Sequence, residues 1–146
     1  SDAGSTAWRG PKFTGLQQTG CGGLTAPRPH GHTLALMIGV FDSGLGGLTV
    51  LRELVSRFKH ADFVYLADHA HVPYGNRPSD EVVELTRSAV EDLFERGARL
   101  VLLGCNTATA VALRRLQQQW LPSSRWAGRH NVLGIVAPTV EAATQT

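Results

Sequence analysis

Short runs of apolar residues alternate with amphipathic stretches from Met37 to the end of the chain. Four runs have the length and continuity of buried strands, at residues 37–41, 63–67, 100–104 and 131–137. Between them, apolar residues recur at helical spacing in residues 49–58, 82–93 and 107–119. Continuous apolar strands that alternate with helices are typical of a parallel sheet covered on both faces. The pattern therefore predicts an α/β fold: a doubly wound parallel sheet with right-handed crossovers.

Start and stop signals support the predicted helices. Pro78-Ser79-Asp80 begins the second helix, with acidic residues at its positive end. Gly97 is expected to close that helix, and Pro122 to stop the next one. The predicted buried stripe of the second helix consists of Val82, Thr86, Ala89, Val90 and Leu93.

Residues 1–36 lack this alternation. They hold seven glycines, three prolines and scattered apolar residues that form no continuous face. Their apolar run Leu34-Ala35-Leu36 is shorter than a signal peptide requires. We expect residues 1–36 to form a disordered arm of upstream or non-native sequence. The expected α/β domain then covers residues 37–130, and residues 131–146 form a fourth strand and the start of a further half.

Composition and charge narrow the class of protein. Of 146 residues, 42% are hydrophobic and 18% are charged, which is ordinary for a globular domain and unlike a disordered tail. The net charge of +2 resides in residues 1–36, whereas residues 37–146 are neutral, so the body shows no basic signature of nucleic-acid binding. Two cysteines, Cys21 and Cys105, exclude a disulfide-stapled secreted scaffold.

Three polar segments follow the first three predicted strands, at residues 42–47, 68–75 and 105–107. In doubly wound sheets, ligands bind beyond the carboxyl ends of the strands. The topology therefore predicts that these segments, which are far apart in the sequence, form one site.

The segment Asp42-Ser43-Gly44-Leu45-Gly46-Gly47 has two interpretations. Its glycines allow a tight turn between strand and helix, which many α/β units need. The same backbone could instead present N–H groups to a carboxylate or phosphate. The spacing matches neither a dinucleotide-binding fingerprint nor a P-loop. Asp42 favours the second interpretation, because it could take or orient a proton beside the anion.

Cys105 is either a small buried hydrophobic residue or a reactive thiol. Its position at a strand end, before a helix N-terminus that would favour a thiolate, indicates the second. Asp42 is a candidate base for it. His69 and His71 are expected to be solvated loop residues, and together with Asp68 they form too small a cluster for a metal site. Tyr74 is expected to form a wall of the pocket.

Three segments resemble the glutamate racemases of the aspartate/glutamate racemase superfamily. They are residues 38–51, Val72-Pro73-Tyr74-Gly75 and Cys105-Asn106-Thr107-Ala108. The resemblance runs from Met37 to about Thr146 and implies the flavodoxin-like N-terminal half of a two-domain fold, here truncated.

The resemblance also implies a function. Family members use two cysteines on opposite faces of the substrate Cα to interconvert L- and D-glutamate, without pyridoxal or metal, and D-glutamate enters peptidoglycan. By resemblance, Cys105 is the first cysteine and Asp42 is its acidic helper. The implied substrate-binding residues are Asp42, Ser43, Tyr74, Gly75, Asn106 and Thr107. The implied partner is glutamate, in the cytoplasm, without nucleic acid or membrane, and a homo-oligomer is one option.

The sequence departs from the family pattern in one major respect. The second cysteine of the family lies in a Cys-Thr-His motif that is absent here, and Cys21 lies in the glycine-rich arm. We therefore expect this chain to be inactive alone as a racemase. Two alternatives remain open: an aspartate racemase or related amino-acid isomerase, and an inactive racemase half that only binds.

Overall fold

The computed structural model describes residues 5–9, 17–19, 23–25 and 36–135. Its central strands are parallel and lie in the order β5-β4-β6-β7. Their bounds are Met37–Asp42 for β4, Asp62–Asp68 for β5, Leu100–Leu103 for β6 and Asn131–Gly134 for β7. All four predicted strands are thus confirmed within the described residues, and the expected residues 136–137 of the last strand lie outside them.

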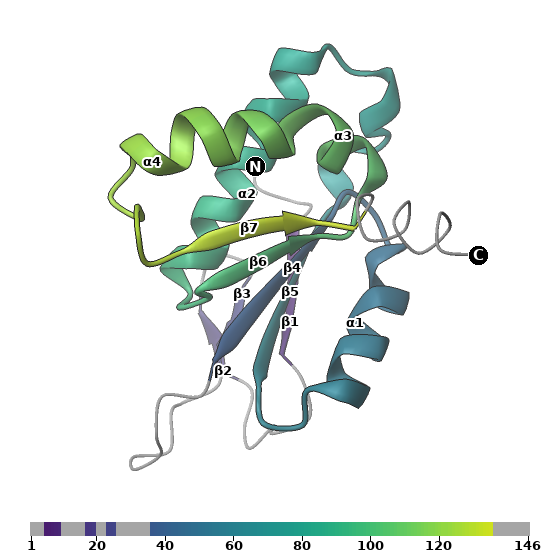
Figure 1. Ribbon diagram of the computed structural model, residues 1–146. Coiled ribbons are helices and arrows are strands. Elements are labelled where there is room, and N and C mark those ends of the chain that lie inside the picture. The colour runs from purple at the N-terminus through teal and green to yellow at the C-terminus, as the bar shows by residue number, and fades with distance from the viewer. Residues whose placement is uncertain (1–4, 10–16, 20–22, 26–35, 136–146) are drawn as a thin grey trace, which may run out of the picture.

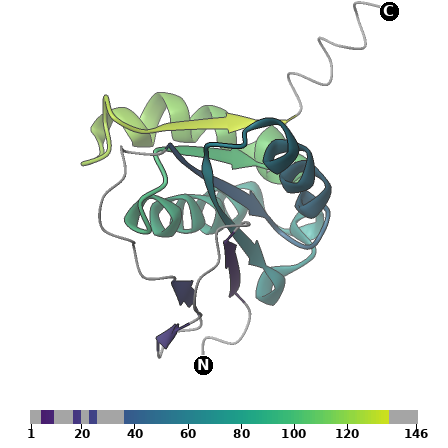
Figure 2. The same cartoon turned by 90° about the horizontal axis from the view of Figure 1, so that it is seen from below.

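Helices cover both faces of this sheet, as Figure 1 and Figure 2 show. One face carries α1 (Gly47–Arg57), and the other carries α2 (Ser79–Glu95) and α3 (Asn106–Arg115). This arrangement confirms the doubly wound α/β fold. The predicted stripe of α2 is buried in full, and Gly97, with φ +100°, follows the helix in the conformation expected of a closing glycine.

Two details of the helices differ from the prediction. The first helix, expected over residues 49–58, ends at Arg57, and Phe58 is its exposed C-cap residue. The third helix, expected to end at Gln119, continues through a π-helix, η3 (Leu116–Trp120), into α4 (Leu121–Ser123). It therefore ends one residue after Pro122, close to the predicted stop.

Three short strands are described within residues 1–36. These are β1 (Ser5–Arg9), β2 (Gln17–Thr19) and β3 (Gly23–Thr25). Strand β1 pairs antiparallel with β5, and β3 and β2 extend the sheet beyond it. The free edge of β5 offers unpaired backbone groups, and pairing to them requires no side-chain periodicity. Cys21 lies outside the described residues.

Candidate active site at the carboxyl edge of the sheet

The carboxyl ends of β4, β5 and β6 lie at one edge of the sheet, and the three predicted polar segments follow them. Ser43 and Cys105 illustrate the convergence, because the serine Oγ lies 3.1 Å from the cysteine Sγ although 62 positions separate them. Glycine makes this approach possible. A Cβ added at Gly104 would lie 3.2 Å from the Cα of Gly47, so the backbones of the two turns nearly touch.

Asp42 organises the glycine-rich turn. Its Oδ2 accepts hydrogen bonds of 3.1 Å from the backbone N–H groups of Gly44 and Gly47. The side chain is only 5% exposed and lies at the N-terminus of α1, where the helix dipole stabilises a negative charge. A Cβ at Gly47 would lie 2.8 Å from the Cβ of Asp42, which explains the glycine. The carboxylate therefore holds the turn in shape.

Tyr65, on β5, supports the same turn from the sheet. Its hydroxyl donates to the carbonyl of Gly44 at 3.1 Å. Burial, and secondarily the charge of Asp42, raises the pKa of Tyr65 well above its ordinary value. The hydroxyl therefore stays protonated as a donor. The sequence pattern did not indicate a role for Tyr65, because a tyrosine within an apolar strand gives no sign that its hydroxyl bonds a distant backbone carbonyl.

Cys105 is the N-cap residue of α3 and is 7% exposed. Besides its contact with Ser43, the sulfur accepts from the backbone N–H of Ala108 at 3.5 Å. The sulfur therefore lies at a helix N-terminus, in contact with a hydroxyl and a backbone N–H. The side chain in hydrogen-bond contact with the thiol is Ser43, whereas the hydrogen bonds of Asp42 run to the backbone of the turn.

The segment after β5 forms two 3-10 turns, η1 (His69–His71) and η2 (Tyr74–Asn76). Tyr74 is buried, and its hydroxyl donates to Oδ2 of Asp68 at 2.8 Å. Burial and this bond raise the pKa of Tyr74 above its ordinary range. Asp68 therefore supplies the polar partner of this buried hydroxyl, and a place for Tyr74 in the wall of the pocket stays a prediction.

Asp68 begins the polar segment 68–75 that was predicted to contribute to the site, but it was not among the expected catalytic or substrate-binding residues. It also contacts His71, whose Nδ1 lies 2.8 Å from Oδ1 and 2.9 Å from Oδ2. His71 thus has a carboxylate partner but keeps a side chain that is 44% exposed, which agrees with the expected solvated loop residue, and His69 is exposed as expected. Asp68 ends β5 just as Asp42 ends β4.

The remaining predicted residues lie around the same edge. A Cβ at Gly75 would lie 4.0 Å from Oγ1 of Thr107, so η2 approaches the first turn of α3. Asn106 begins α3 and is exposed, and Thr107 is half-buried. The edge thus combines a thiol, hydroxyls and backbone donors, a set suited to hold an amino acid carboxylate beside a sulfur base.

Two further properties concern the described ranges only. There, no three His, Cys, Asp or Glu side chains form a group that could hold a metal ion. No helix in these ranges combines the length and apolar character that crossing a membrane requires.

Comparisons with known proteins identify relatives. No family model matches the chain. A glutamate racemase of Caulobacter sp. (strain K31) is 65% identical over 111 residues, which cover 75% of this chain and 39% of the relative. The solved glutamate racemase of Aquifex pyrophilus superposes with a TM-score of 0.68 at 37% identity, over 76% of this chain and 41% of that one.

A third relative has a bound amino acid. Escherichia coli glutamate racemase, solved in complex with L-glutamate and the activator UDP-MurNAc-Ala, is 28% identical, with a TM-score of 0.60. The match covers 73% of this chain and 39% of the Escherichia coli protein. The chain thus spans about two-fifths of the length of these relatives.

Proposed function

Because the chain resembles the N-terminal part of glutamate racemases over three-quarters of its length, we propose that it carries one half of a glutamate racemase active site. The observation that supports this most directly is the contact between Cys105 and Ser43 at 3.1 Å. Cys105 follows β6 at the edge where doubly wound sheets bind their ligands, and its sulfur contacts a hydroxyl and a backbone N–H.

In the proposed reaction, the thiolate of Cys105 removes the proton from Cα of glutamate. The electron pair left at Cα is delocalised into the α-carboxylate, and donors around that carboxylate stabilise the developing charge. Ser43, Tyr74, Gly75, Asn106 and Thr107 are the proposed substrate-binding residues, together with Asp42. Asp42 also assists Cys105, and the geometry favours assistance through the shape of the turn, because its carboxylate binds the turn amides.

Inversion requires a second acid that returns a proton to the opposite face of Cα. In the whole protein we assign this role to a second cysteine outside the present sequence. The reaction needs neither pyridoxal nor metal, and its product, D-glutamate, supplies peptidoglycan synthesis in the cytoplasm. This chain by itself is then expected to exchange the Cα proton without inverting the centre.

Proton exchange in D₂O tests the proposal. The chain is incubated with L-glutamate, D-glutamate or L-aspartate, and loss of the Cα proton signal is followed by NMR. Exchange with glutamate that disappears in Cys105→Ser supports the proposal. Exchange only with aspartate would move the chain to the aspartate branch. No exchange with any substrate, in a folded chain, would leave a binding-only half and overturn the proposed chemistry.

A further inference from the structure

Thr109, in the second turn of α3, contacts the backbone on both sides of Gly104. Its Oγ1 lies 2.9 Å from the carbonyl oxygen of Cys105 and 3.2 Å from that of Leu103. Its backbone N–H also donates to the carbonyl of Cys105, at 2.9 Å. A threonine in a helix commonly bonds the carbonyl four positions earlier. Here the same hydroxyl also reaches the last carbonyl of β6, so one side chain ties strand, link and helix together.

The link that Thr109 holds determines where the thiol points. Gly104 and Cys105 connect β6 to α3, and Cys105 has extended backbone angles, φ −84° and ψ 123°. The two sulfur contacts, with Oγ of Ser43 and N–H of Ala108, require this orientation. A change of these angles moves the sulfur away from Ser43 directly, since Cβ and Sγ follow the backbone.

The position of Thr109 is itself fixed by β7. A Cβ added at Gly134 would lie only 2.2 Å from Cγ2 of Thr109 and 3.1 Å from its Oγ1. The side chain is therefore packed directly against the strand backbone and is 6% exposed. A β-branched side chain with its methyl confined in this way has one accessible rotamer, and that rotamer aims the hydroxyl at the two carbonyls.

We propose that Thr109 is a positioning residue that holds the thiol of Cys105 against Ser43. The proposal rests on the proposed function only in taking Cys105 as the reacting thiol. Thr109 touches no substrate in this scheme and acts through the backbone of Cys105.

A double-mutant cycle tests the proposal on the full chain without any substrate. Thr109→Val keeps the shape and removes the hydroxyl, Thr109→Ala removes both, and Thr109→Ser keeps the hydroxyl. Each is combined with Ser43→Ala, and the rate of Cys105 alkylation by iodoacetamide is measured by peptide mass spectrometry, which separates Cys105 from Cys21. Urea unfolding of each variant identifies those that remain folded.

One hydrogen bond to the sulfur predicts that Ser43→Ala changes the alkylation rate about threefold in the original chain. We expect the same change with Thr109→Ser and almost none with Thr109→Val or Thr109→Ala. Equal effects of Ser43→Ala in every background would overturn the proposal. Alkylation needs no glutamate, so the two proposals can fail separately. If Ser43→Ala has equal effects in all backgrounds while Cα exchange is intact, only the positioning role is contradicted. If the effect of Ser43→Ala depends on the Thr109 hydroxyl as expected but no Cα exchange occurs, only the proposed function is contradicted.

Discussion

Asp42 shows how a single residue can serve both fold and chemistry. The same carboxylate that the resemblance assigns to catalysis caps the glycine turn through two backbone amides. Buried N–H groups that lose their acceptor carry a desolvation cost, so the turn depends on this side chain. The structural role and the proposed assistance to Cys105 are compatible, because the turn also carries Ser43 to the sulfur.

Asp42→Ala is expected to lower the free energy of unfolding by about 2 kcal/mol, since it removes the acceptor of two backbone N–H groups, one buried and one half-buried, at the start of α1. Urea unfolding followed by circular dichroism measures the loss. Asp80→Ala is the control, because Asp80 is exposed in the first turn of α2 and pairs with Arg115 on the surface. A surface pair of this kind contributes at most about 1 kcal/mol. Equal losses in both variants would contradict the assignment.

The two tyrosines of the chain are expected to resist ionisation while the protein is folded. Burial is the main cause that raises the pKa of both Tyr65 and Tyr74 above the ordinary value of 10.0. The unfolded chain therefore releases these protons first as the pH rises, and the folded state loses stability above about pH 10. Below that pH the stabilisation is fully present.

Absorbance at the tyrosinate band measures this effect. The native chain should show almost no tyrosinate signal until it unfolds, whereas the chain in urea should titrate near pH 10. A native titration that overlays the urea curve would show that neither hydroxyl is held as described.

Among the helices and strands, the hydrophobic pattern correctly predicted the elements whose position depends only on burying apolar side chains. The strands of the parallel sheet and the stripe of α2 are buried on the faces that their periodicity indicates. The continuation of the third helix from Gln119 to Ser123 was not predictable, because it runs through a local π turn. The pairing of β1 with β5 also escaped prediction, since backbone groups alone create it.

The candidate site also combines features that the hydrophobic pattern predicts with contacts that it does not predict. Strand ends were visible in the pattern, so the convergence of Ser43 and Cys105 could be expected. The partners of Tyr74 and Tyr65 could not, because a hydrogen bond between a side chain and a distant group leaves no periodic trace. The hydrogen bond between Thr109 and the carbonyl of Leu103 could not be predicted for the same reason.

The contact between β7 and α3 predicts a strong effect of a small substitution. Gly134→Ala places a methyl group against Thr109 and also 2.9 Å from Cδ2 of Leu113. Overpacking of this kind costs about 2 kcal/mol, and we expect a clear drop in the melting temperature. Gly75→Ala is the control, because the nearest atom to the added carbon lies 4.0 Å away. Equal melting temperatures for the two variants would contradict the packing described.

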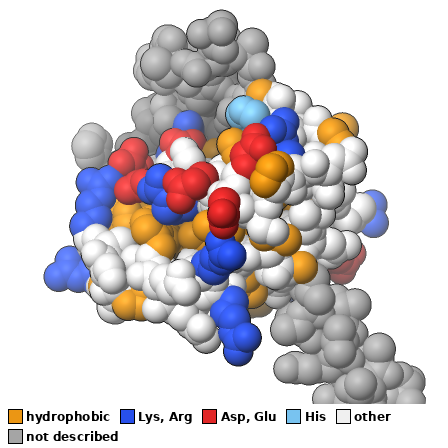
Figure 3. Space-filling view, turned by 90° about the horizontal axis from the view of Figure 1, so that it is seen from above, with side chains coloured by type: hydrophobic (Ala, Val, Ile, Leu, Met, Phe, Trp, Pro, Cys, Tyr) orange, Lys and Arg blue, Asp and Glu red, His pale blue; other side chains and the backbone are white. Residues whose placement is uncertain are grey.

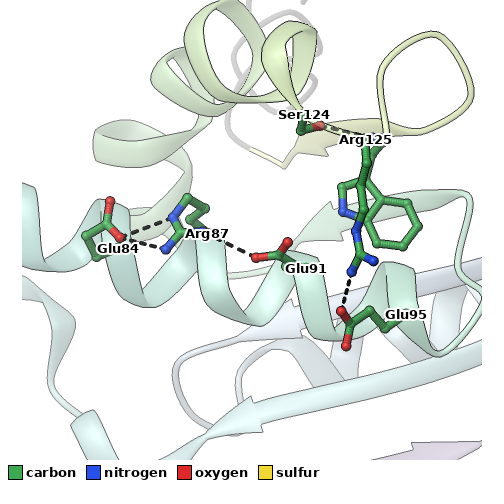
Figure 4. Close-up of polar contacts among 7 residues, drawn as sticks. Glu84, Arg87, Glu91, Glu95, Ser124 and Arg125 are labelled. Atoms are coloured by element: carbon green, nitrogen blue, oxygen red, sulfur yellow. Dashed lines mark hydrogen bonds and ion pairs between the residues drawn. The ribbon is translucent and has the colours of Figure 1, made fainter.

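At the scale of the whole molecule, the two faces of the sheet differ. Arg87 lies between Glu84 and Glu91 on α2, and Arg125 reaches back to Glu95, as Figure 4 shows. On the face seen in Figure 3, acidic and basic side chains are interspersed with hydrophobic ones. This side of the molecule presents a charged surface to solvent.

The α1 side instead has an open apolar groove of about 520 Å³. Its lining residues are Leu45, Leu48, Leu51, Arg52, Val55, Tyr65, Ala67 and His69. Leu45 is 62% exposed. An exposed patch of this kind favours association, so the isolated chain is expected to self-associate with rising concentration in sedimentation velocity experiments.

Leu48→Lys should reduce this association, because it places a charge in the groove. Leu133→Lys is the matched control, since both leucines are 42% exposed and Leu133 lies on β7, outside the groove. A stable monomer at every concentration, or an equal effect of both variants, would contradict a role of the groove.

The proposed function requires one working thiol in this chain, the first of the two that inversion at Cα needs. The most direct measurement compares Cα proton exchange of L-glutamate and of D-glutamate in D₂O, in separate reactions, with chiral analysis of the products. A single thiol faces one side of Cα, so we predict exchange of one enantiomer with retention of its configuration. Equal exchange of both enantiomers, or formation of one from the other, would contradict the proposal that a single thiol acts on one face of Cα.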